Sequence, residues 1–109
     1  MPNKKAKNSF IGLWRINWME AWDADFFDME SPASITIDKD NLGELHFGNV
    51  HGEIDGRAEN GKFEFTWAGQ AEEEEASGRG WFELEGEEIT GAIYFHMGEE
   101  SAFRTYYER

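Results

Sequence analysis

Short segments of alternating apolar and polar residues, separated by turn-forming runs, constrain this chain more than any other feature of its sequence. In the segment 62–67, KFEFTW, the aromatic residues Phe63, Phe65 and Trp67 occupy every second position. Because successive side chains of a strand point to opposite faces, these rings share one face of an extended chain. Comparable alternation occurs at 35–37, 45–47, 82–84, 89–97 and 103–107. The pattern predicts an all-β fold of seven or eight strands.

The connections between these segments are short and rich in Asp, Asn and Gly, as in the run 38–43. Consecutive strands joined by short turns pair in antiparallel fashion, and closure of the sheet removes its exposed edges. We therefore predict an antiparallel up-and-down barrel formed by residues 10–109 as one domain, preceded by a flexible basic tail at residues 1–9. A change of alternation near Gly48 and Asn49 is interpreted as a β-bulge.

Aromatic residues dominate the predicted interior of the barrel. The chain has nine Phe, five Trp and three Tyr, and each such side chain can bury about 150–250 Å². An eight-stranded barrel is just wide enough for its side chains to fill, so we predict a packed interior with at most a small pocket at one end. The residues expected to point inward are Trp14, Ile35, Ile37, Leu45, Phe47, Ile54, Phe63, Phe65, Trp67, Phe82, Leu84, Ile89, Ile93, Phe95, Phe103 and Tyr107.

The segment that follows the first predicted strand changes from strand to helical spacing. Asp23 is a suitable N-cap for a short helix over residues 24–29, and the residue before Pro32 would end it. A second interpretation starts the helix earlier, with Asn17 as its cap, and leaves open whether Trp18 belongs to the strand or to the helix. The apolar residues at helical spacing are Met19, Trp22, Phe26 and Met29.

Charge and composition exclude several classes of partner. The formal net charge is −13, and three of the ten basic residues lie in the tail, which leaves 7 basic and 23 acidic residues, a net −16, in residues 8–109. Recognition of nucleic acid through its phosphates needs a basic surface, so no nucleic-acid partner is expected. The chain has no cysteine, and no segment approaches the roughly 20 apolar residues of a membrane span. We therefore expect a cytoplasmic protein without disulfides or a membrane partner.

One run of residues carries metal-ligating side chains. In HGEID, His51, Glu53 and Asp55 alternate with apolar residues and share one strand face, and histidine with carboxylates suits zinc or a similar ion. A solvated polar face gives the same pattern, and the row lacks a convincing fourth ligand. The sequence therefore predicts no metal site and no cofactor. Arg57 extends the row and is expected to pair with Asp55 or Glu64.

Two further groups of residues are candidates for chemical sites. Arg79 and Trp81 share a face and would form a platform for a partner or an anion, although Arg79 also suits an ion pair with the acidic run 72–75, a predicted solvated connection between strands. His96 would serve as a general base with nearby glutamates, but a surface histidine is the preferred interpretation. Ser101 has no flanking elbow glycines, so nucleophilic catalysis has no support.

The mouth of the predicted barrel is the favoured place for a ligand. Trp22 is expected where the first strand gives way to acidic, helix-forming sequence, and a ring surrounded by carboxylates suits a cationic or aromatic ligand. Packing of Trp22 on Phe26, as part of a lid, is the competing interpretation. The full set of candidate ligand-binding residues is Trp18, Glu20, Trp22, Asp25, Asp55, Arg57, Arg79 and His96.

Two groups of known proteins share short motifs with this chain. Gly12, Leu13 and Trp14, on the first strand of a small barrel, resemble the Gly-x-Trp of calycins, the superfamily of lipocalins and avidins. That resemblance implies structural roles for Gly12 and Trp14, and implies that Arg104, or else Arg109, packs across Trp14 at the closed end of the barrel. The segments GLWRI, WDADF, FGNVHGEIDGR, ASGRGW and FHMGEESAF together resemble a group of small bacterial proteins that implies no activity.

Three functions follow in order of preference. The first is a non-catalytic module that binds a small apolar or aromatic ligand at the barrel mouth. The alternative is a protein-interaction or oligomerising domain with an acidic surface, for example a homodimer through the first strand, where Ile11, Leu13 and Met19 need cover. An enzyme comes third, because the residues that would support catalysis are limited to His96 and neighbouring carboxylates.

Overall fold

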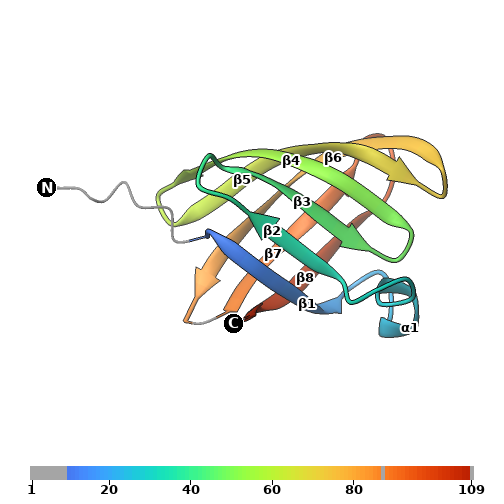
Figure 1. The fold of residues 1–109 in the computed structure, drawn as a ribbon, viewed down its shortest axis with the longest axis horizontal. Coiled ribbons are helices and arrows are strands. Elements are labelled where there is room, and N and C mark those ends of the chain that lie inside the picture. Colours follow the sequence, from blue (N-terminus) through green and yellow to red (C-terminus); the bar gives the residue numbers. More distant parts are fainter. Residues whose placement is uncertain (1–9, 87, 109) are drawn as a thin grey trace, which may run out of the picture.

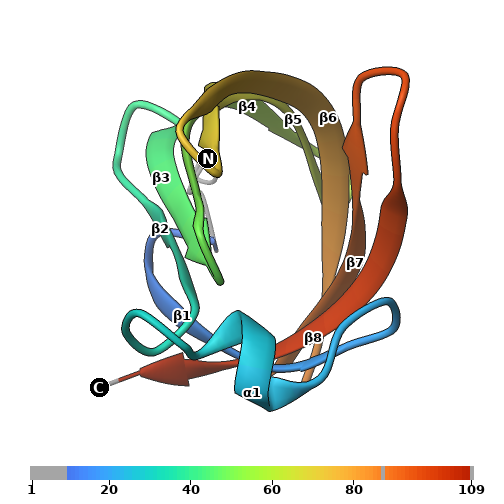
Figure 2. The same ribbon diagram turned by 90° about the vertical axis from the view of Figure 1, so that its right-hand side faces the viewer.

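The computed structural model describes residues 10–86 and 88–108, and these form a closed antiparallel barrel of eight strands (Figures 1 and 2). Each strand pairs with its sequence neighbour, and the last strand returns to pair with the first. The strands are β1 (Gly12–Met19), β2 (Ser34–Ile37), β3 (Leu42–Phe47), β4 (Val50–Glu59), β5 (Lys62–Ala71), β6 (Glu74–Glu85), β7 (Glu88–Phe95) and β8 (Glu100–Glu108), with the helix α1 (Ala24–Phe27) between β1 and β2. The predicted all-β up-and-down barrel is confirmed, whereas the predicted tail at residues 1–9 lies outside the described residues.

Stacked aromatic rings fill the interior of the barrel. The rings of Phe63 and Phe82 lie parallel with centroids 5.0 Å apart, and Phe10 meets Phe82 edge-on at 5.2 Å. Most residues expected to point inward are buried. Leu84 and Tyr107 are exceptions, at 39% and 41% exposure. Both residues lie near the ends of long strands, and an inward side chain at the end of a strand lies at the rim of the barrel, where solvent reaches it.

The connection between β3 and β4 is a two-residue turn, so the predicted bulge at Gly48 and Asn49 is wrong. Phe47 pairs directly with Val50 across the hairpin. Gly48 has a backbone φ of 57°, a conformation that most residues other than glycine adopt only with strain. A turn and a bulge both change the alternation of inward and outward residues, which is why the sequence pattern did not separate them.

The acidic run at residues 72–75 is solvated and contains the connection between β5 and β6, as expected, and this connection is a tight turn. Only Glu72 and Glu73 connect β5 to β6, and their φ values of 54° and 69° are both positive. Two-residue hairpins with positive φ at both positions match the right-handed twist of the flanking strands. The next two glutamates already belong to β6, and all four are exposed.

The bulge lies instead in β1. The register between β1 and β8 shifts between Ile16 and Trp18, so Asn17 is the extra residue. The strand continues to Met19, which rules out the helix that would begin with Asn17 as its cap. Beyond the shift, Met19 is buried and Trp18 faces outward at 41% exposure. Met19 therefore needs no cover outside the barrel.

The predicted short helix lies across the rim of one end of the barrel (Figure 2). Asp23 caps α1, because its carboxylate accepts a hydrogen bond from the Phe26 backbone N–H. The helix ends at Phe27, earlier than residue 29, and Phe27 is buried against the core. The Phe27 carbonyl accepts a hydrogen bond of 2.8 Å from Gly48 N–H, which fixes α1 to the β3–β4 turn. No helix among the described residues is long and apolar enough to cross a membrane.

The Gly-x-Trp tryptophan is structural, but its partner differs from the one that the calycin resemblance implies. Trp14 is 3% exposed, donates its indole N–H to the Phe10 carbonyl at 2.9 Å, and meets Tyr107 edge-on at 5.1 Å. Arg104 points outward and lies over the ring of Trp18 at 5.0 Å. The expected Arg104–Trp14 contact is wrong, because the inward residues of β8 are the neighbours of Arg104, and the alternative, Arg109, lies outside the described residues.

Candidate functional site

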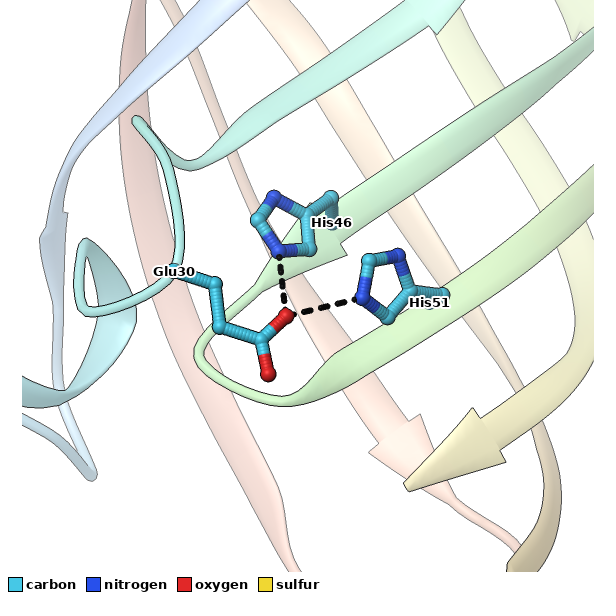
Figure 3. Close-up of side chains that lie close together, drawn as sticks. All are labelled: Glu30, His46 and His51. Atoms are coloured by element: carbon cyan, nitrogen blue, oxygen red, sulfur yellow. Dashed lines mark hydrogen bonds and ion pairs between the residues drawn. The ribbon is translucent and has the colours of Figure 1, made fainter. Parts of the chain in front are cut away.

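Three metal-ligating side chains converge on the outer surface of the barrel beside α1 (Figure 3). His46 belongs to β3, His51 to β4, and Glu30 to the connection between α1 and β2. The Glu30 Oε1 atom lies 3.0 Å from Nε2 of His51 and 3.5 Å from Nε2 of His46. One carboxylate oxygen is therefore shared by two imidazole nitrogens.

The β3–β4 turn brings the two histidines together. Phe47 and Val50 form the first pair of the hairpin, and His46 and His51 form the next. Since Phe47 and Val50 point into the barrel, the histidines on the neighbouring positions point outward. Their rings stack with centroids 4.3 Å apart and an interplanar angle of 30°.

The end of α1 positions Glu30 over this pair. Asp28 follows the helix, and its carboxylate accepts a hydrogen bond of 2.8 Å from Ala33 N–H. This contact closes residues 28–33 into a compact loop against the barrel. Within the loop, the Ser31 hydroxyl lies 3.1 Å from Nδ1 of His46. His46 is thus held at one ring nitrogen by Ser31, while its other nitrogen faces Glu30.

The three side chains differ in their access to solvent. The His46 side chain is only 14% exposed, compared with 61% for His51 and 45% for Glu30. His46 Nε2 is buried and makes no described hydrogen bond, and its contact with the Glu30 carboxylate is the longer ion-pair approach of 3.5 Å. The hydrogen bond from His51 is the main reason that the pKa of Glu30 lies below its usual range, and His46 adds to the effect.

The spacing of the donor atoms suits a bound transition-metal ion. Zinc binds imidazole nitrogen and carboxylate oxygen at about 2.0–2.2 Å in tetrahedral geometry, which separates two of its donors by about 3.3 Å. The two nitrogen-to-oxygen distances, 3.0 and 3.5 Å, lie on either side of that value. All three ligand atoms lie within 4.8 Å of one another. Three bonds to one ion would also require the stacked imidazole rings to turn, so that both Nε2 lone pairs point at a common centre.

A groove adjoins this cluster on the outer face of β2 to β6. His46 and His51 line one part of it. Glu44 and Glu53 form the neighbouring cross-strand pair and line it further along. The remaining lining residues are Ser34, Thr36, Leu45, Gly52, Ala68, Gly69, Gln70 and Glu75.

The predicted ligand site at the barrel mouth is occupied by the protein's own rings. Trp22 stacks on Phe26 at 5.7 Å and also contacts Phe47 at 5.3 Å and Phe95 at 6.1 Å. Trp22 is half-buried and belongs to the edge of the core. This arrangement closes the end of the barrel at α1.

The acidic residues expected around Trp22 do not converge on it as a set. The Glu20 carboxylate accepts a hydrogen bond from Ala102 N–H at 3.3 Å, which ties the end of β1 to β8. Asp25 is exposed in the first turn of α1. Trp18 lies on the outer face of β1 under Arg104.

The other predicted site residues lie on a different part of the outer surface. Arg57 pairs with Glu59, at 3.9 Å, rather than with Asp55 or Glu64. This exposed ion pair is within its own strand. Asp55 and Arg57 line a shallow hollow on β4 to β6, away from the histidine pair.

Arg79 and His96 also lie apart from the histidine pair. The Arg79 guanidinium lies over the ring of Tyr94 at 4.2 Å. Arg79 makes no described contact with Trp81 or with the acidic residues 72–75. The cation over the Trp81 ring is Lys62, at 5.0 Å. His96 is exposed in the connection between β7 and β8. Arg79 lines the same hollow as Asp55 and Arg57, and it lines a second hollow with His96, but the structure does not bring all of the predicted residues together as one site.

Sequence reasoning considered His51 but missed Glu30 and His46. A two-residue turn at Gly48 and Asn49 would have placed His46 and His51 as cross-strand partners on the outer face. The position of Glu30 has no comparable local signal, because it depends on where α1 contacts the barrel.

Comparisons of this chain with protein-family models, with curated proteins and with solved structures gave no match. The functional interpretation therefore depends on the geometry of the barrel and of its surface.

Proposed function

We propose that this protein is a non-catalytic binding module whose ligand is a divalent transition-metal ion such as Zn²⁺, held by Glu30, His46 and His51. The observation that carries this proposal is the buried Nε2 of His46, which has no hydrogen-bond partner and faces the oxygen that His51 also approaches. Buried polar atoms without partners are uncommon in folded proteins. A metal ion between the three donors would satisfy this atom.

The contact between Ser31 and His46 supports the same role. When the hydroxyl of Ser31 accepts a hydrogen bond from Nδ1–H, the neutral imidazole of His46 carries its lone pair on Nε2. A cation bound between Nε2 and the Glu30 carboxylate would then take the place of the direct contact by which His46 helps to lower the pKa of Glu30. Hydrogen bonds of this kind orient the histidine ligands of known metal sites.

Binding on the outer surface agrees with the packing of the barrel. Phe63, Phe82 and the rings around them occupy the interior, and Trp22 occupies the mouth. An apolar ligand inside the barrel would have to displace these side chains. The proposal therefore keeps the binding role expected from the sequence, but it replaces the apolar ligand with a metal ion on the outer surface.

Calorimetric titration of the untagged protein with Zn²⁺ tests the proposal. We expect one ion to bind per chain. Loss of a residue that only hydrogen-bonds to a metal ligand typically weakens metal binding about 10- to 100-fold. Loss of a ligand itself, in Glu30→Gln, His46→Ala or His51→Ala, should weaken it more. His96→Ala is the matched control, because His96 is the remaining histidine of the chain and is exposed elsewhere. Equal loss in the control, or no binding by the unaltered protein, would overturn the proposal.

A further inference from the structure

We infer that the bound ion takes a further ligand from outside the chain, and that the adjoining groove selects a molecule with a neutral donor nitrogen and a separate, positively charged group. This inference depends on the proposed metal site. It specifies the class of molecule that the module would bind through its metal. It follows from the number of protein donors, their exposure and the charges that line the groove.

The protein supplies too few donors to enclose the ion. Structural zinc sites usually have four protein ligands, whereas three ligands leave a position for water or another molecule. Among the described residues, Glu30, His46 and His51 form the complete group of clustered metal-ligating side chains. His51 and Glu30 are 61% and 45% exposed, so a molecule from solvent can reach the ion beside them.

The groove beside the site is negatively charged. Glu44 and Glu53 occupy directly opposed positions on β3 and β4, and Glu75 on β6 also lines the groove. Like charges that face each other across a sheet repel, and a positive group between them relieves that repulsion. No lysine or arginine is among the described residues that line this groove.

These charges decide which outside donors bind well. A carboxylate or another anion would meet the field of the glutamates, whereas a neutral imidazole or amine would not. Glu53 lies two residues after His51 on the same face of β4, a separation of about 7 Å along a strand. A ligand whose cationic group lies at about that distance from its donor nitrogen would contact the ion and the glutamate pair together.

Three imidazoles of similar size separate these effects. In 1-propylimidazole, 1-(3-aminopropyl)imidazole and 3-(imidazol-1-yl)propanoate, the ring offers one donor nitrogen, and the side chain is neutral, cationic or anionic. Each is titrated into the full-length protein loaded with Co²⁺, whose visible absorption changes when a ligand is added. We expect the aminopropyl compound to bind about two- to fivefold more tightly than the propyl compound, and the propanoate to bind least tightly.

Variants of the groove test the origin of the selectivity. Glu53→Gln should reduce the preference for the aminopropyl compound and leave the affinity for 1-propylimidazole unchanged. Glu85→Gln, which removes an exposed glutamate from the far end of β6, is the matched control and should change neither value. Raising the salt concentration should bring the three affinities together, because exposed charges are screened.

The outcomes distinguish this inference from the proposal on which it depends. If Co²⁺ binds at the histidine pair but none of the imidazoles changes its spectrum, the open position is disproved and the metal site stands. Equal affinities for the three compounds at low salt would disprove the selectivity. Absence of a Co²⁺ spectrum that depends on His46 and His51 would instead disprove the metal site itself.

Discussion

His46 and His51 face each other across the β3–β4 hairpin, with their imidazole rings stacked 4.3 Å apart. Both positions are fixed by backbone pairing, so neither histidine depends on a flexible loop for its place. Glu30 belongs instead to the connection after α1. A site built from two strand residues and one loop residue is largely formed before an ion arrives, which reduces the ordering that binding requires.

Gly48 should be the most sensitive turn glycine of the chain. A Cβ at this position would lie 2.4 Å from the ring of Phe26, in addition to the strain of its φ of 57°. Gly61 is the control, because its φ is 80° but no atom lies within 4 Å of the added carbon. Gly61→Ala should destabilise by about 1 kcal/mol, and Gly48→Ala by about 1–3 kcal/mol more. Denaturant titrations measure both, and equal losses would contradict the contact between α1 and the turn.

The tryptophans of the first strand and its extension should differ in their contributions to stability. Trp14 is 3% exposed, and its replacement by alanine should cost about 3–5 kcal/mol. Trp22→Ala should cost clearly less, because Trp22 is half-buried at the barrel rim. Trp18 lies on the outer face, so Trp18→Ala should cost about 1 kcal/mol or less. The free energies of unfolding of the three variants decide this order, and a loss at Trp22 equal to that at Trp14 would make Trp22 a full core residue.

Acid should remove the stabilising contribution of Glu30. Its pKa is lowered in the folded protein, chiefly by the hydrogen bond from His51. A lowered pKa means that the contribution is present above the unfolded value, 4.5, and is lost as the pH falls through the folded value. Melting temperatures of the metal-free protein and of Glu30→Gln should therefore converge on acidification from pH 6 towards pH 3. A difference that stayed constant or widened would show that the ionised carboxylate is not responsible.

Added salt should stabilise the protein at neutral pH. The formal net charge is −13, and repulsion among the carboxylates destabilises the compact state. Moderate salt screens these charges, since the Debye length falls to about 10 Å at 0.1 M. The melting temperature should rise between low and moderate concentrations of sodium chloride. A flat or falling melting temperature would mean that favourable ion pairs, such as Arg15 with Glu108, outweigh the repulsion.

The barrel and its core could be predicted because they depend on local alternation. Phe63, Phe65 and Trp67 are buried where period-two spacing predicted them, and Asp23 caps the helix that its position indicated. Alternation also places Arg104 outward, between Phe103 and Thr105, and the expected contact with Trp14 came from the calycin resemblance rather than from this pattern. The expectations of a cytoplasmic location and of no nucleic-acid partner stay predictions.

The candidate site was harder to predict because its parts lie far apart in the sequence. The histidine pair depends on a two-residue turn that resembles a bulge in the sequence pattern. Glu30 joins it only because the Phe27 carbonyl accepts a hydrogen bond from Gly48 and brings the end of α1 to the same hairpin. Neither relationship produces a periodic signal, so the sequence suggested the row of His51, Glu53 and Asp55 instead.

Anomalous X-ray scattering from crystals grown with Zn²⁺ tests the metal site most directly. Diffraction data collected on either side of the zinc absorption edge locate the ion without reference to the protein geometry. We predict one strong peak at about 2.0–2.2 Å from Nε2 of His46, Nε2 of His51 and the Glu30 carboxylate. A peak between Glu44 and Glu53 with none at the histidine pair, or no peak at all, would contradict the proposed site.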